Sequence, residues 1–315
     1  MNPLSALYGA AVCVRNQLYE RSMLPTYCLE GPVVSIGNLT IGGSGKTPFL
    51  IMLGELLQQR GIAFDVLSRG YRRQTQGVAI VDPNGSARDF GDEPLLIARK
   101  LGVHVVIGED RHQAGETAEA TFGSQLHLLD DGFQHRQLAR DFDIVLVTET
   151  DAQDSRLPSG RLREPISSLS RADAIVLTND TSADGLQLHN QLVWRVQRDI
   201  VAPETLDPCF AFCCIARPER FYAQLEAAQV VLAGTRSYRD HHRYTEADVR
   251  DLQRLRQEAG ASMFVTTEKD AINLGPHMHE LQPMHVVPVR LRLEDANGAI
   301  DAMLATVAER KKKAT

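Results

Sequence analysis

The feature that most constrains this chain is a glycine-rich segment, Gly42–Thr47, that lies between a predicted strand and a predicted helix. Glycines let several backbone N–H groups crowd around phosphate oxygens without side-chain clashes. The N-terminus of the following helix adds free N–H donors and partial positive charge. Lys46 is placed to reach the β and γ phosphates, and the Thr47 hydroxyl is placed to bind Mg²⁺. We therefore predict an ATP-binding phosphate loop made of Thr40, Ile41, Gly42, Gly43, Ser44, Gly45, Lys46 and Thr47.

Two positions depart from better-known forms of this loop. The usual pattern, G-x-x-x-x-G-K-[ST], has its first glycine where this chain has Thr40. Partitioning and metallochaperone ATPases or GTPases, which act as switches, usually carry a lysine where this chain has Ile41. The segment Thr178–Thr181 also lacks an Asn-Lys-x-Asp guanine signature. A P-loop switch is therefore the alternative to a kinase, and it is the less favoured of the two.

Short apolar runs alternate with helical patterns from Pro32 to about Asp180. This alternation is typical of βαβ units, and the right-handed crossover rule then favours a doubly wound, mostly parallel α/β sheet. The predicted strands are Val33–Gly37, Ala63–Ser68, Val103–Gly108, Gln125–Asp130, Asp143–Thr148 and Asp173–Thr178, and the predicted helices are Pro48–Arg60, Glu93–Leu101 and Arg111–Phe122.

A polar stretch, Asn179–Gly185, interrupts this pattern and precedes a second α/β set. We predict a P-loop domain over residues 1–182, with an amphipathic helix at its N-terminus, and a smaller C-terminal α/β domain over residues 183–315. The second set contains a predicted helix, Thr245–Glu258, and predicted strands at Ala211–Ile215, Val230–Ala233, Ser262–Thr266 and His285–Leu291.

The bulk composition excludes several classes of protein. The net charge of −6 argues against wholesale binding of nucleic acid. The 5 cysteines form no Cys-x-x-Cys pair, which indicates neither a zinc site nor a disulfide framework and fits a reducing cytosol. No window approaches the roughly 18–20 apolar residues that span a bilayer.

The N-terminal segment has apolar residues at helical spacing, from Leu4 to Leu18, with Arg15 and Arg21 nearby. Such a helix can lie on a membrane surface or pack against the protein's own body. The residues alone favour packing against the body.

An acidic pair, Asp130 and Asp131, ends the predicted apolar strand that begins at Gln125. A P-loop enzyme needs a carboxylate at the end of a neighbouring strand to hold Mg²⁺ or its water. We predict that Asp130, together with Thr47, binds this metal.

Several polar runs follow predicted strands, and together they resemble one family, tetraacyldisaccharide 4′-kinase of the lipid A pathway. The resemblance extends from about Leu4 to Val289. Members of that family also lack the first glycine of the usual phosphate-loop pattern, as this chain does at Thr40. Its motifs are Gly37–Pro48, Leu67–Tyr71, Gly91–Pro94, Leu129–His135, Leu162–Pro165, Asp240–His241 and Thr267–Asp270, in the order of the family.

The resemblance implies an ATP- and Mg²⁺-dependent kinase. The acceptor would be the 4′-hydroxyl of a tetraacylated glucosamine disaccharide 1-phosphate, and the product would be a bis-phosphorylated lipid A precursor. It also implies that the N-terminal helix lies on the cytoplasmic face of a Gram-negative inner membrane, whereas the residues alone favoured packing against the body. We expect the protein to be a monomer. The smaller domain would close over the cleft.

The resemblance also implies roles for individual residues. Asp92 would be the catalytic base, His241 its partner, and Lys46 a further catalytic residue. A carboxylate–histidine pair makes chemical sense, because the histidine orients the acid and raises its basicity. The residues expected to bind the acceptor are Tyr71, Arg111, Asp131, Gln134, His135, Arg163 and Glu164.

Overall fold

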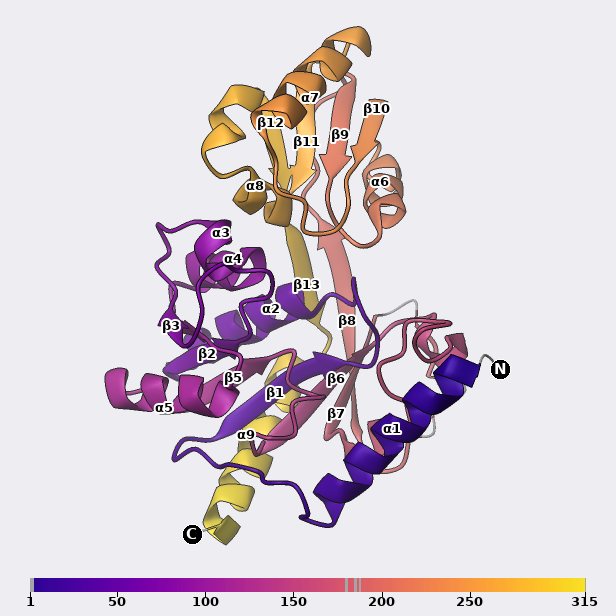
Figure 1. The fold of residues 1–315 in the computed structure, drawn as a ribbon. Helices are drawn as coiled ribbons and strands as arrows, with labels where there is room; N and C mark the ends of the chain where they lie inside the picture. Colours follow the sequence, from indigo (N-terminus) through magenta and orange to yellow (C-terminus); the bar gives the residue numbers. More distant parts are fainter. Residues whose placement is uncertain (1–2, 179–180, 184–185, 187, 315) are drawn as a thin grey trace.

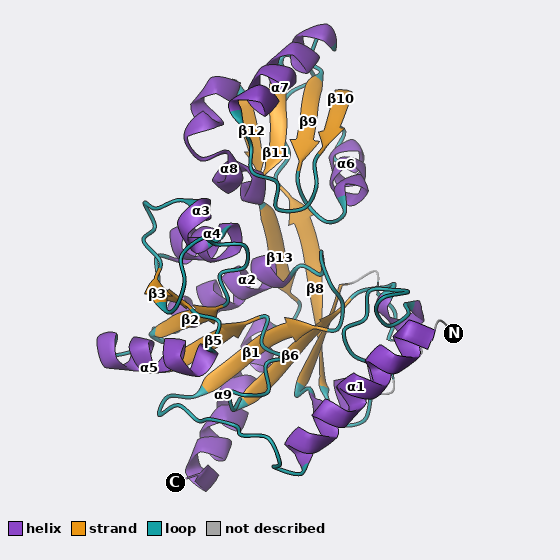
Figure 2. Ribbon diagram, in the orientation of Figure 1, coloured by secondary structure: helices purple, strands orange, loops and turns teal. Residues whose placement is uncertain are grey.

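The computed structural model describes residues 3–178, 181–183, 186 and 188–314, and the strands in these ranges form two sheets (Figures 1 and 2). The larger sheet has nine strands in the order β13-β8-β7-β6-β1-β5-β2-β4-β3. The smaller sheet has four strands in the order β10-β9-β11-β12 and stands above the larger one in Figure 1. The predicted α/β class with a mostly parallel sheet is confirmed.

The centre of the larger sheet is parallel, and β1 lies between β5 and β6. Its central strands are buried along their whole length and mostly apolar, because helices cover both faces of the sheet. The strands are β1 Val33–Asn38, β2 Phe64–Ser68, β3 Ala79–Ile80, β4 Val105–Ile107, β5 Leu126–Asp130, β6 Phe142–Val147, β7 Ala174–Thr178, β8 Leu192–Ile200 and β13 Val289–Leu293. Two pairs at the edges are antiparallel, β3 with β4 and β13 with β8.

Helices on the two faces of this sheet divide its core in two. One face packs against α2 (Lys46–Gln59), α4 (Asp92–Leu101) and α9 (Ala296–Ala314), and the other packs against α5 (Arg111–Thr121). Phe49 and Leu53 of α2 are fully buried against the strands. This packing fixes the start of α2 at the carboxyl end of β1, where the phosphate loop lies.

The smaller sheet is entirely parallel and has its own core. The rings of Phe210, Phe212 and Phe264 meet edge to face with centroids 5.7–6.2 Å apart, an arrangement that aromatic quadrupoles favour. Its elements are β9 Cys209–Cys213, α6 Pro218–Ala227, β10 Leu232–Ser237, α7 Glu246–Glu258, β11 Met263–Thr267, α8 Glu268–Leu274 and β12 Met284–Val287. A capping box between Thr245 and Asp248 begins α7.

The prediction of a single strand over His285–Leu291 is wrong in one respect. Within these residues the chain leaves the smaller sheet and joins the larger one. β12 ends at Val287, and β13 begins at Val289 as the antiparallel partner of β8. Pro288, between them, has no N–H to donate to either ladder. Residues from Val289 onward therefore return to the larger sheet.

This topology differs from the predicted division at residues 182 and 183. β8, β13 and α9 all pack with the larger sheet, although they follow residue 183. The smaller sheet takes only Cys209–Val287. Of the polar stretch predicted to separate the two units, residues 179, 180, 184 and 185 lie outside the described ranges.

The N-terminal helix α1 (Pro3–Glu20) packs on the protein by its small and polar residues. Ser5 donates to Ser159 over 2.8 Å, and Asn16 donates to Glu164 over 2.7 Å. Apolar side chains project on its other side, where Leu4 is 61% and Leu7 is 70% exposed. The helix therefore packs against the body and also presents an apolar surface to solvent.

Candidate active site

The phosphate loop has the backbone that its glycines were expected to provide. Gly42, Gly43 and Gly45 have φ angles of 75°, 50° and 85°, a region that residues with a Cβ rarely adopt. Thr40 is different, because it forms an isolated antiparallel bridge with Leu162 and is fully buried. A residue in an extended bridge does not need the conformational freedom of glycine, which explains why threonine is tolerated there.

Two cations converge on one carboxylate beside this loop. Lys46 Nζ donates to Asn38 Oδ1 over 3.0 Å and lies 3.4 Å from Asp131 Oδ1. Arg163 binds both oxygens of Asp131, each over 2.8 Å. Burial raises the pKa of Asp131, but Lys46 and Arg163 outweigh it and hold the pKa below its usual range. Two positive groups, Lys46 on the loop and Arg163 beside it, are therefore fixed at the position where phosphate charge would lie.

Asp130, at the end of β5, has the properties expected of a metal ligand. Ser68 donates to Asp130 Oδ2 over 2.8 Å, whereas Oδ1 is buried and has no hydrogen-bond partner among the described residues. Burial raises the pKa of Asp130 to about 7, and the charges of Glu93 and Asp131 add to this effect. A bound cation would satisfy the free oxygen and relieve the repulsion, so the site fits Mg²⁺. Thr47 lines the same cleft.

No group of three or more His, Cys, Asp and Glu residues in the described ranges has the geometry of a metal site. A magnesium site that uses one carboxylate, one hydroxyl and nucleotide phosphates does not require such a group.

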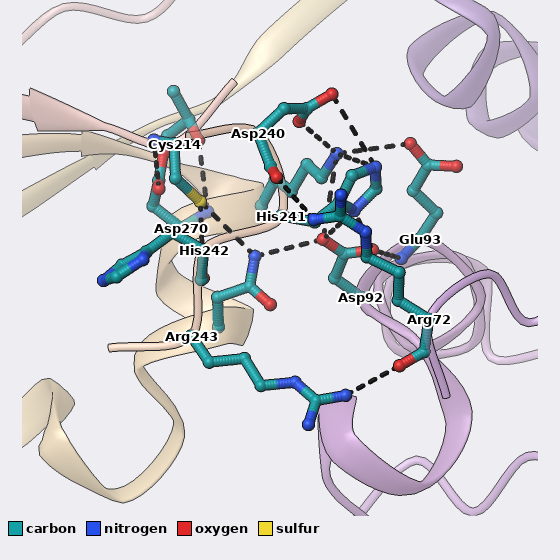
Figure 3. Close-up of polar contacts among 12 residues, drawn as sticks. Arg72, Asp92, Glu93, Cys214, Asp240, His241, His242, Arg243 and Asp270 are labelled. Atoms are coloured by element: carbon teal, nitrogen blue, oxygen red, sulfur yellow. Dashed lines mark hydrogen bonds and ion pairs between the residues drawn. The ribbon is translucent and has the colours of Figure 1, made fainter. Parts of the chain in front are cut away.

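Asp92, at the start of α4, and His241, in the loop between β10 and α7, meet across the cleft (Figure 3). Asp92 is the first residue of α4, where the helix dipole favours a carboxylate. His241 Nδ1 lies 2.9 Å from Asp92 Oδ2 and 3.1 Å from Oδ1. Asn273 donates to the same Oδ2 over 3.0 Å. Burial raises the pKa of Asp92, but the hydrogen bond from His241 and the charge of Lys269 outweigh it, and the pKa is lowered below its usual range.

Lys269 and Asn273 are functional candidates to which the sequence interpretation gave no role. Both are carried by α8, whose Thr267–Asp270 start was recognised as a family motif without a role for any of its residues. Lys269 Nζ lies 3.4 Å from Glu93, 3.2 Å from Asp240 and 3.3 Å from His241 Nε2. Burial lowers the pKa of Lys269, but the surrounding carboxylates raise it above its ordinary value. The positions of Lys269 and Asn273 at the site depend on the packing of α8 against α4, which the local sequence does not show.

The phosphate loop, the acidic pair and the Asp92–His241 pair all line one cleft of about 1150 Å³ between the two sheets. Of the residues expected to bind the acceptor, Tyr71, Asp131 and Arg163 line it as well. The ring of Tyr71 meets that of His241 edge on, with centroids 5.2 Å apart.

The other four residues expected to bind the acceptor, Arg111, Gln134, His135 and Glu164, are not among the residues that line this cleft. Glu164 is fully buried under α1, where Arg171 donates to it over 2.8 Å. Gln134 donates to the carbonyl of Asn38, beneath the phosphate loop. Burial and the charge of Arg111 lower the pKa of His135 to about 4, so these two side chains lie near each other. Arg111 is buried and His135 is half-buried.

One wall of the cleft, formed by β8, β13 and the start of α6, is strongly basic, a feature that no local motif indicated. Burial lowers the pKa of Arg198, and the nearby charge of Arg220 lowers it further. One guanidinium nitrogen of Arg217 is buried without a partner among the described residues. The arginines that line this wall are Arg198, Arg217, Arg220, Arg290 and Arg292.

A phosphate loop at the head of a doubly wound sheet, facing a carboxylate–histidine pair across a cleft, defines a P-loop kinase. The family model described as tetraacyldisaccharide-1-P 4′-kinase, LpxK, matches residues 1–308. The chain belongs to this family, and it is an ATP-dependent kinase.

Proteins named tetraacyldisaccharide 4′-kinase are similar over most of the chain. The one from Koribacter versatilis is 48% identical over 321 residues, covering 99% of this chain and 100% of the relative. The one from Chlorobaculum parvum is 39% identical and covers 86% of this chain and 82% of the relative. The crystal structure of LpxK from Aquifex aeolicus in complex with ATP is 30% identical, with a TM-score of 0.79 and 97% of each chain covered.

Among the described helices, none combines the length and the apolar character needed to cross a bilayer.

Proposed function

We propose that this protein transfers the γ-phosphate of ATP to the 4′-hydroxyl of a tetraacylated glucosamine disaccharide 1-phosphate. The observation that carries the proposal is the Asp92–His241 contact, 2.9 Å long, in the cleft that the phosphate loop also lines. A nucleotide switch has no need of a carboxylate base at this position. The named relatives, which act on a tetraacyldisaccharide, supply the acceptor.

In this reaction the acceptor oxygen forms a bond to the γ-phosphorus, and the bond from that phosphorus to the β–γ bridging oxygen breaks. ADP leaves, and Asp92 takes the proton of the acceptor hydroxyl. Lys46 and the loop N–H groups stabilise the charge that develops on the phosphoryl oxygens. Arg163 and Tyr71, which line the same cleft as Asp92, bind and orient the acceptor together with Asp131.

Asp130 and Thr47 would hold Mg²⁺, which would neutralise phosphate charge and orient the β and γ phosphates. The free buried oxygen of Asp130 supports this assignment. The smaller sheet forms the opposite wall of the cleft, and closure of this wall over bound ATP would exclude water from the reacting groups.

Helix α1 supports peripheral association with a membrane. Its exposed apolar side chains include Leu4, Leu7 and Val14, all at least 55% exposed. An acceptor that resides in a bilayer requires an enzyme that works at its surface, so we assign this helix to the cytoplasmic face of an inner membrane. The protein would act there as a monomer.

The decisive experiment measures phosphorylation of the acylated disaccharide 1-phosphate by purified protein with MgATP. We expect the wild type to be active, Lys46→Ala to be inactive, and Asp92→Asn to lose at least about 100-fold in kcat. Full activity of Lys46→Ala would contradict the phosphate-loop assignment. ATP hydrolysis that proceeds without transfer to the acceptor would support the switch instead.

A further inference from the structure

The turn that joins β9 to α6 lies against the phosphate loop. Ala216 and Arg217 belong to this turn, and both line the cleft. A Cβ placed on Gly42 would be 3.1 Å from the Cβ of Ala216. A Cβ placed on Gly43 would be 3.5 Å from Cγ of Arg217. The smaller sheet therefore brings the stem of an arginine into contact with the middle of the loop.

Two features fix the position of this turn. The N–H of Cys214, at the end of β9, donates to Oδ1 of the fully buried Asp270 over 2.7 Å. Pro218 is the first residue of α6, and a proline disfavours the helical conformation in the residue before it. Arg217 accordingly has φ −135° and ψ 72°, outside the helical region. Its backbone is thus held at the edge of the cleft by a hydrogen bond on one side and a proline on the other.

The charge of Arg217 is not compensated by its surroundings. Its Nη2 is buried and has no hydrogen-bond partner within the described part of the chain. Burial lowers the pKa of Arg217, the charges of Arg220 and Arg161 lower it further, and the nearby carboxylates do not outweigh them. A buried cation without a partner is costly, so this position fits an anionic ligand.

The start of α6 adds to the same effect. A helix N-terminus carries partial positive charge and favours anions. α2 and α6 both begin at this cleft, α2 with Lys46 and α6 with Pro218 beside Arg217. The ends of two helices and the guanidinium group therefore act on the same space above the loop.

A cation from outside the loop also has a chemical purpose. Negative charge on the phosphoryl oxygens must be stabilised during transfer, and in other P-loop enzymes an arginine supplied from elsewhere does so. Lys46 and Arg163 already contact Asp131, which offsets part of their charge. Ile41 stands where switch ATPases usually carry an additional lysine. Arg217, on the opposite wall, is in a position to supply the charge that Ile41 does not.

We propose that Arg217 is a further catalytic residue, whose guanidinium group donates to β- and γ-phosphate oxygens of ATP from the side of Gly42 and Gly43. It stabilises the charge on these oxygens while the γ-phosphoryl group moves to the acceptor. It exchanges no proton, because a guanidinium group stays charged. This role rests on the proposed function.

The first test measures nucleotide binding without the acceptor, by calorimetry on full-length protein. The probes are the Mg²⁺ complex of an ATP analogue with nitrogen at the β–γ bridge, and AMP, which has neither of the two phosphates. In Arg217→Met the affinity for the triphosphate analogue should fall at least about tenfold, because a charge-assisted hydrogen bond is lost. The affinity for AMP should change less than about twofold.

Arg250 offers a matched control on the same part of the chain. It lies on α7, is paired with Glu246, and does not line the cleft. Arg250→Met removes the same charge and should bind both nucleotides as the wild type does. Equal losses for the triphosphate analogue and AMP in Arg217→Met, or no loss for either, would overturn the proposal.

The second test is the kinetics of transfer to the acylated acceptor. With saturating MgATP, Arg217→Met should lower kcat at least about 100-fold. Arg217→Lys keeps the charge but not the planar fork, and should lower kcat at least about fivefold. If Arg217→Met does not fold, Arg217→Lys decides the matter, and an unchanged kcat in that variant would overturn the proposal.

The acceptor carries a phosphate of its own, which Arg217 could bind instead. In that case Arg217→Met would raise the KM for the acceptor and leave both kcat and the affinity for the triphosphate analogue unchanged, which would also overturn the proposal. If the wild type does not phosphorylate the acceptor, the proposed function fails. The comparison of the triphosphate analogue with AMP then still decides whether Arg217 binds nucleotide phosphates.

Discussion

Replacing His127 with glutamine should change how the stability of the larger sheet depends on pH. His127, on β5, is fully buried between two carboxylates. Its Nδ1 lies 2.8 Å from Asp65 Oδ1, and its Nε2 lies 3.3 Å from Glu119 Oε1. Burial lowers the pKa of His127, but Asp65 and Glu119 outweigh it and raise the pKa above the ordinary value of 6.5.

The sign of the effect follows from this raised pKa. The folded protein holds the proton of His127 more tightly than the unfolded chain does. The charged histidine therefore contributes its full stabilisation below about pH 6.5, and the contribution is lost as the pH rises through the folded pKa. In His127→Gln this part of the pH dependence should be absent.

The size of the effect follows from the buried carboxylates. Removing one partner of a buried ion pair costs about 3–5 kcal/mol, because a charge stays buried without compensation. The side chain of Asp65 is fully buried, and its Oδ2 already lacks a partner among the described residues. Glutamine can still donate to one carboxylate, so we expect a loss of about 3 kcal/mol in the free energy of unfolding at pH 6.

Urea unfolding followed by tryptophan fluorescence measures this quantity. The only tryptophan, Trp194, is buried on β8 and stacks on Phe142 of β6, so it reports on the larger sheet. His104→Gln is the control, because the ring of His104 stacks on Phe122 and does not lie between carboxylates. A difference between wild type and His127→Gln that stays constant from about pH 6 to pH 9 would refute the reasoning.

Three further predictions concern the site, a helix cap and the membrane surface. Because the metal-free pKa of Asp130 is about 7, the affinity for MgATP measured by calorimetry should fall about tenfold per unit as the pH drops below 7, and Asp130→Asn should abolish this dependence. Thr245→Ala removes the hydrogen bond that begins α7 and should lower the free energy of unfolding by about 1 kcal/mol in thermal melts, with ATP binding as the control. The double variant Leu4→Ser with Leu7→Ser should weaken sedimentation with anionic vesicles at least about tenfold while the affinity for ATP stays the same; equal sedimentation would count against a membrane role for α1.

The parts of the fold that could be predicted are those that local sequence determines. The phosphate loop was predictable because a strand, a run of glycines and a helix follow one another within Val33–Gln59. β5 and its two terminal aspartates were predictable for the same reason, since an apolar strand ends at charged residues. In these segments burial on both faces leaves a mostly apolar run, which is easily recognised.

The parts that were missed depend on partners far away in the chain. β8 was not predicted, because its sequence Leu192–Ile200 mixes arginines and an aspartate with apolar residues, as is usual near the edge of a sheet. Lys269 is an ordinary charged residue until α8 packs on α4. Glu164 was expected to bind the acceptor, and only the packing of α1 shows that Asn16 and Arg171 occupy its carboxylate.

The return of the chain through Pro288 makes the smaller sheet an insertion into a hairpin. Ile200 and Val289 are paired residues of β8 and β13, so the two ends of the insertion lie side by side on adjacent strands. A two-residue turn is enough to join antiparallel strands at such a point. Excising residues 201–288 and closing this turn should leave a continuous larger sheet with the phosphate loop but without His241 and Lys269. The chain thus places the phosphate loop and Asp92 in one part, and His241 and Lys269, which contact Asp92, in an insertion joined to that part at one hairpin.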